Sequence, residues 1–129
     1  MATNTQITPL AFIRLGMAAG VLLFGVVVLI VHQQAKWTPA SSLPAAIRIV
    51  QVALAVSAVF AAFVIRGRVA AESDLAKRNS LLITGWAVGE GSALLGGVIF
   101  FLTPEWQWYA LGLLAMLASF RLLPIPRVA

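Results

Sequence analysis

The sequence contains no cysteine, a single histidine and only four acidic residues. The absence of cysteine excludes disulfides, thiolate metal sites and cysteine nucleophiles. His32 is the only histidine, and two of the four acids share one loop, so no group of residues has the spacing of a metal site. We therefore expect no metal and no cofactor. Nothing resembles a nucleophile with its base or a phosphate-binding glycine loop, and we predict that the protein is not an enzyme.

Charge is scarce throughout the chain. Only 10% of the residues are charged and 61% are hydrophobic, whereas soluble domains have about 25% charged and about 45–50% apolar residues. A chain of 129 residues is too short to bury several apolar helices inside a water-soluble shell, so its solvent must be lipid. The net charge of +5 lies at the ends of apolar segments, which favours anionic headgroups over nucleic acid as the partner.

Four apolar segments alternate with polar ones, and each is close to the ~20 residues that a helix needs to cross a bilayer. The first is longer than the ~7–15-residue apolar region of a signal peptide and lacks a small-residue cleavage site, so we expect it to be retained. Asn79 or Ser80 is placed to cap the third. We predict an all-α integral membrane protein, a four-helix up-and-down bundle forming one transmembrane domain over residues 1–129. The expected spans are 10–31, 43–65, 80–102 and 106–123.

The basic residues predict the orientation of the chain. Four spans place both termini on the same side as the polar segment 66–78. That side collects seven of the nine basic residues, leaving Lys36 and Arg48 on the other. By the positive-inside rule we expect both termini in the cytoplasm and the bundle in the cell (inner) membrane. We expect the opposite end to have an aromatic belt: Trp37, Trp106, Trp108 and Tyr109.

Glu90 lies near the middle of the third segment, close to mid-depth of a ~30 Å hydrocarbon core. An ionisable group is costly there, so a functional role in binding a proton or cation is the default hypothesis. The alternative is a protonated carboxyl that only locks two helices together by one hydrogen bond. Three side chains of the second segment are candidate partners: Gln51, Ser57 and Arg48. For Arg48, extension to the headgroups is the favoured alternative.

Small residues at a spacing of four predict close helix packing. One row follows the third segment, which we expect to be the central helix, and Glu90 borders it. A shorter pair in the first segment fits the same pattern, although ordinary use of glycine in a membrane helix explains it equally well. The residues are Gly85, Gly89, Ala93 and Gly97 in the row and Gly16 and Gly20 in the pair.

Residues 76–102 (AKRNSLLITGWAVGEGSALLGGVIFFL) resemble the carboxylate-bearing helix of the rotary ATPase proteolipid, subunit c. In that family a basic polar loop leads into a helix whose mid-membrane Glu or Asp binds the translocated ion. The matching parts are Lys77-Arg78-Asn79, Gly85-Trp86-Ala87, Glu90 and Ala93-Leu94. The resemblance implies that Glu90 is an ion-binding carboxylate. The preceding segment, 43–65, contains no glycine, whereas the family has a glycine seam in its preceding helix.

Two functions follow from these features. The first is a small non-enzymatic membrane protein, a subunit or oligomerising helix bundle whose partners are the lipid bilayer and other membrane subunits or further copies of itself. The alternative is a proton- or cation-coupled carrier or channel subunit that uses Glu90. Replacing Glu90 with glutamine separates them, because only the second function requires a group that ionises.

Overall fold

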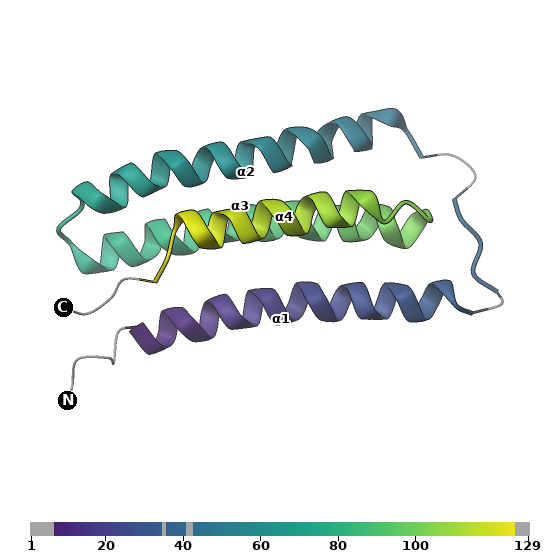
Figure 1. Cartoon of the computed structure of the whole chain (residues 1–129), viewed down its shortest axis with the longest axis horizontal. Helices are drawn as coiled ribbons and strands as arrows, with labels where there is room; N and C mark the ends of the chain where they lie inside the picture. Colours follow the sequence, from purple (N-terminus) through teal and green to yellow (C-terminus); the bar gives the residue numbers. More distant parts are fainter. Residues whose placement is uncertain (1–6, 35, 41–42, 126–129) are drawn as a thin grey trace.

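The structure is a computed structural model that describes residues 7–34, 36–40 and 43–125. It contains four helices, α1 (Ile7–His32), α2 (Ala45–Ala71), α3 (Leu75–Leu102) and α4 (Gln107–Leu122), and the described residues include no strand. Successive helices run in opposite directions, so the described ends of the chain lie at the same end as the turn between α2 and α3 (Figure 1). The prediction of an all-α, up-and-down four-helix bundle is confirmed.

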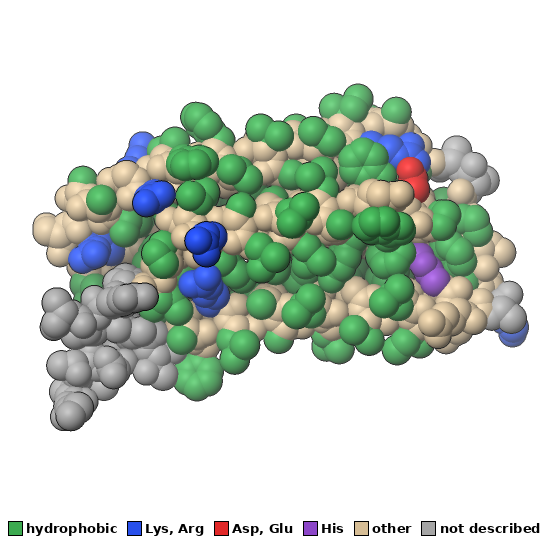
Figure 2. Space-filling view, viewed as in Figure 1, with side chains coloured by type: hydrophobic (Ala, Val, Ile, Leu, Met, Phe, Trp, Pro, Cys, Tyr) green, Lys and Arg blue, Asp and Glu red, His purple; other side chains and the backbone are tan. Residues whose placement is uncertain are grey.

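The helices have the dimensions and surface of a membrane protein. Helices α1, α2 and α3 are long and apolar enough to cross a bilayer, whereas the 16 residues of α4 extend about 24 Å, less than the ~30 Å hydrocarbon core. Large apolar side chains point outward, among them Phe12 at 68% exposure and Phe60 at 70%. Apolar side chains cover much of the middle of the bundle (Figure 2). This surface suits lipid, since a soluble monomer rarely exposes so large an apolar area.

The polar segment between the second and third spans is mostly helical. Helix α2 continues to Ala71 and α3 begins at Leu75, so only residues 72–74 are non-helical. The carboxylate of Asp74 accepts a hydrogen bond from the backbone N–H of Ala76 at 3.0 Å and caps α3. The prediction that Asn79 or Ser80 caps this helix is therefore wrong. The intervening Leu-Ala-Lys-Arg run consists of good helix formers, which lets the helix begin one turn earlier.

Helix α3 is the centre of the bundle, as expected from its small residues. It packs along α4, and it lies between α1 and α2 (Figure 1). A Cβ atom at Gly112 would lie 2.6 Å from the Cα atom of Ala93, and one at Gly89 would lie 3.1 Å from the Cα atom of Met116. Carbon atoms normally pack at ~3.5–4.0 Å. The backbones of α3 and α4 thus approach closely because glycine occupies both positions.

Two side chains hold the end of α4 near the chain termini. The indole N–H of Trp86, which is fully buried, donates to the carbonyl of Leu123 at 2.9 Å. Arg14 donates to the carbonyl of Phe120 at 2.9 Å, and its guanidinium lies 4.8 Å from the centre of the Phe120 ring. Carbonyls in the last turn of a helix have no partner within the helix, so α1 and α3 supply donors to the end of α4.

Candidate functional site

Glu90 lies near the middle of α3, on the side that faces α1. One turn earlier, the Trp86 ring lies 5.6 Å from the Arg14 guanidinium of α1. Two turns later, a Cβ at Gly97 would lie 2.6 Å from Phe24 Cδ1, also on α1. Since α1 and α3 run in the same direction (Figure 1), Glu90 lies at the depth of Ala18. Glu90 is half-buried as a residue, and its carboxyl group forms no ion pair with another described residue.

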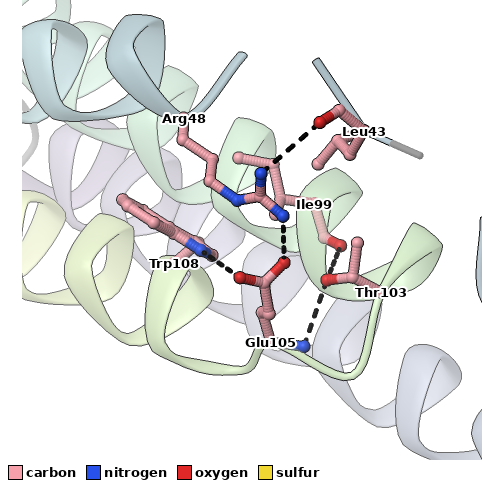
Figure 3. Close-up of polar contacts among 6 residues, drawn as sticks. All are labelled: Leu43, Arg48, Ile99, Thr103, Glu105 and Trp108. Atoms are coloured by element: carbon pink, nitrogen blue, oxygen red, sulfur yellow. Dashed lines mark hydrogen bonds and ion pairs between the residues drawn. The ribbon is translucent and has the colours of Figure 1, made fainter. Parts of the chain in front are cut away.

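Arg48, a candidate partner of Glu90, is engaged elsewhere. Its Nη2 atom lies 2.6 Å from Oε2 of Glu105, and both side chains are about one-third exposed, at 32% and 35%. Nη1 donates to the carbonyl of Leu43 at 3.4 Å. These contacts fix the start of α2 to the turn before α4 (Figure 3). Arg48 thus pairs with the protein at the end of the bundle away from the termini.

Glu105 is held by groups around it. The indole N–H of Trp108 donates to its Oε1 at 3.4 Å, and its own backbone N–H donates to the Thr103 hydroxyl at 3.1 Å (Figure 3). The hydrogen bond from Arg48 is the main cause that holds the pKa of the Glu105 carboxyl below its usual value. Sequence reasoning missed this ion pair, although the opposite charges of Arg48 and Glu105 fall at the same end of two adjacent spans.

Gln51 is fully buried and binds two neighbouring helices. Its amide donates to the carbonyl of Ser92 on α3 and to that of Trp108 on α4, each at 3.0 Å. Ser92 is two residues from Glu90, which places it about 200° away around the helix. Gln51 therefore faces the opposite side of α3 from Glu90. The fourth candidate, Ser57, is exposed on α2. The structure does not assemble Glu90, Gln51, Ser57 and Arg48 into one site.

The small-residue row on α3 contacts two helices. A Cβ at Gly85 would collide with the Leu123 side chain beyond α4, one at Gly89 with Ser119, and Ala93 lies against Gly112. Gly97 instead faces α1. A spacing of four residues turns by about 40° per step on a helix of 3.6 residues per turn, so the row winds from α4 toward α1.

Gly16 and Gly20 do not pack against any other described helix. Both are exposed, and a Cβ at either would meet no atom within 4 Å. They lie on the outer face of α1, at about the same depth in the bundle as Glu90 on α3. No described helix of this chain packs against the pair.

The aromatic residues at the far end do not all form a belt. Trp106 is exposed, and Trp37 is partly exposed. The Trp37 ring lies 4.0 Å from the His32 ring between ring centres, at a tilt of 37°. Tyr109, however, is buried, and its hydroxyl donates to the carbonyl of Val21 on α1. Gly25 leaves the space for this ring, because a Cβ there would collide with the Tyr109 hydroxyl. Tyr109 thus attaches α1 to α4, and its expected place in the belt is wrong.

Within the described part of the chain, no three histidine or acidic residues cluster in a way that holds a metal ion. Helices α1 and α3 place one partly exposed acidic residue, Glu90, near the middle of the bundle. No family model, curated protein or solved structure matches this chain. The resemblance of residues 76–102 to the proteolipid therefore stays a prediction.

Proposed function

We propose that this protein is a non-enzymatic subunit of a membrane assembly, formed with other membrane proteins or with copies of itself. The observation that carries the proposal is the half-buried carboxyl of Glu90 at mid-depth. Charged groups in the membrane almost always face protein or water, since exposure to lipid is costly. The described residues leave part of Glu90 exposed, so we infer that a further helix covers the remainder.

The outer face of α1 supports this arrangement. Gly16 and Gly20 form an unoccupied small-residue surface at the depth of Glu90, and such pairs let the backbone of a second helix approach closely. Helix α1 itself packs mainly on α3, leaving most of its apolar surface, including Leu22 at 56% and Leu23 at 64% exposure, uncovered. A partner helix seated there would add contacts that α1 lacks within this chain.

The orientation that we propose places the termini in the cytoplasm of a cell (inner) membrane. Six of the described basic residues belong to the half of the bundle that contains the turn between α2 and α3, and Lys36 and Arg48 belong to the other half. Basic side chains accordingly gather toward the end with that turn in Figure 2. This bias is the one that the positive-inside rule associates with the cytoplasmic side. The six are Arg14, Arg66, Arg68, Lys77, Arg78 and Arg121.

A second function is a proton- or cation-coupled carrier or channel subunit that uses Glu90. The observation in its favour is that none of the three candidate side chains on α2 neutralises the carboxylate. Arg48 pairs with Glu105, Gln51 faces the other side of α3, and Ser57 points outward. A carboxyl group left free in this way is available to a proton or cation.

Glu90→Gln tests both functions in full-length protein purified from native membranes. The subunit function predicts the same assembly mass by native mass spectrometry and no change in proton permeability of reconstituted vesicles. The transport function predicts the same mass with proton coupling lost. Glu72→Gln, the same chemical change in the polar turn after α2, is the matched control and should alter neither readout. A monomeric mass for the unmodified protein in mild detergent would contradict the subunit function.

A further inference from the structure

A basic pocket opens between the end of α2, the start of α3 and the end of α4. It has a volume of about 270 Å³ and is lined by one arginine from each helix: Arg66, Arg78 and Arg121. Apolar side chains form the rest of its wall, including Leu82, Leu122 and Pro124. Its lining includes no acidic residue, and none of the three arginines pairs with a described carboxylate. The Nε atom of Arg78 is buried and has no hydrogen-bond partner among the described residues.

The chemistry of this pocket selects an anion. Guanidinium groups bind phosphate through paired, charge-assisted hydrogen bonds. Three arginines in a wall without an acidic residue make the pocket positively charged, and the buried Nε–H of Arg78 is a donor without an acceptor among the described residues. The volume of about 270 Å³ is just below the ~300–1,000 Å³ range for small-molecule sites, which suits a headgroup better than a larger ligand.

An apolar groove continues from the pocket toward the middle of the membrane. It has a volume of about 590 Å³ and lies between α2 and α4, with Val56, Phe60 and Phe63 on one side and Leu114 and Ala118 on the other. On α2, Arg66 follows Phe63 by three residues. On α4, Arg121 follows Ala118 by three residues. Residues at this spacing share a helix face, so the groove and the pocket are two parts of one surface.

We propose that this surface binds a phospholipid with a net negative headgroup, whose phosphate occupies the arginine pocket and one of whose acyl chains lies in the groove. Basic pockets between membrane helices recognise anionic headgroups in this way. The groove extends the site by about 12 Å along α2 and distinguishes a lipid from a soluble phosphate, which would use the pocket alone. The site lies on α2, α4 and the start of α3, whereas Glu90 and the glycine pair lie toward α1, so it is independent of the proposed assembly.

Lipid titration of the full-length protein, followed by native mass spectrometry, tests the proposal. The probes are phosphatidylglycerol and phosphatidylcholine with identical acyl chains. The pocket variant is Arg66→Gln with Arg121→Gln, and the control is Arg68→Gln with Lys77→Gln, which removes the same charge outside the pocket. We expect affinity for phosphatidylglycerol to fall about fivefold per arginine, or about 25-fold in the pocket variant. The control should change less than about twofold, within the range of surface substitutions.

Two further arms identify the ligand. Ala118→Phe fills the groove and should weaken phosphatidylglycerol binding without affecting binding of inorganic phosphate. Arg66→Lys with Arg121→Lys retains the charge, and its affinity for phosphatidylglycerol should lie between those of the native protein and the glutamine variant. Equal losses of phosphatidylglycerol affinity in the pocket and control variants would overturn the proposal, because they would show that diffuse surface charge attracts the lipid. Equal affinity for both lipids, or full displacement of lipid by inorganic phosphate, would also overturn it.

Discussion

Substitution of Gly112 by alanine tests the close contact between α3 and α4. The new methyl carbon would lie 2.6 Å from the Cα atom of Ala93, about 1 Å less than a normal carbon contact. The obstructing atoms belong to the α3 backbone, so no side-chain rotation relieves the overlap. The two helices must separate by about the same 1 Å.

The expected loss of stability in Gly112→Ala has two parts. Overpacking of a well-packed core costs about 1–3 kcal/mol. Separation also strains Gln51, because its amide bonds both Ser92 on α3 and Trp108 on α4, and loss of one such bond costs about 1 kcal/mol. We therefore expect Gly112→Ala to lower the free energy of unfolding by about 2–4 kcal/mol relative to its control.

The control is Gly91→Ala, at a similar depth on α3, where a Cβ would meet nothing within 4 Å. Both changes raise helix propensity to a similar degree, so that effect cancels in the comparison. Unfolding in mixed micelles by added denaturing detergent, followed by the fluorescence of the tryptophans, gives the two free energies. A difference below about 0.5 kcal/mol would refute the packing argument.

The remaining predictions concern the end of the bundle that includes Glu105 and Tyr109. Tyr109→Phe removes the hydrogen bond to Val21 and should lower the free energy of unfolding by about 1 kcal/mol. Amide hydrogen exchange should become faster in α1 alone. Equally faster exchange in α3 and α4 would contradict this prediction. The pKa of Glu105 is lower in the folded than in the unfolded protein because of Arg48. The ion pair therefore contributes fully to stability above the ordinary carboxyl pKa of 4.5. This contribution is lost as the pH falls below that value. Glu105→Gln should therefore flatten the decline in unfolding midpoint over that acidic range, and identical declines in both proteins would count against the ion pair.

The four helices could be predicted because long apolar segments have few alternatives in a membrane. Their ends at the polar turn could not. Segments 66–71 and 75–78 contain four basic residues, which end the apolar runs on either side, yet most of their residues favour a helix. The hydropathy signal therefore ends before the hydrogen-bonded helices do. Only the Asp74 cap fixes the start of α3.

The surroundings of Glu90 could be predicted only in part. Sequence spacing assigns a residue to a face of its own helix, but it does not say which helix covers that face. Gln51 and Glu90 have similar depths, yet they lie on opposite sides of α3 because α2 and α1 flank that helix separately. Tyr109 illustrates the same limit, since its position near a membrane surface fits a belt, while Gly25 on α1 creates the space that buries it.

The central claim is that another helix covers the outer face of α1 beside Glu90. The chain has no cysteine, so a single Gly20→Cys substitution can hold a photo-crosslinker at that face in native membranes. Val52→Cys, at a similar depth on the exposed surface of α2, is the control. We predict that the label at position 20 joins the protein to a second polypeptide and that the label at position 52 does not. Equal crosslinking at both positions, or adducts with lipid alone at position 20, would contradict the claim.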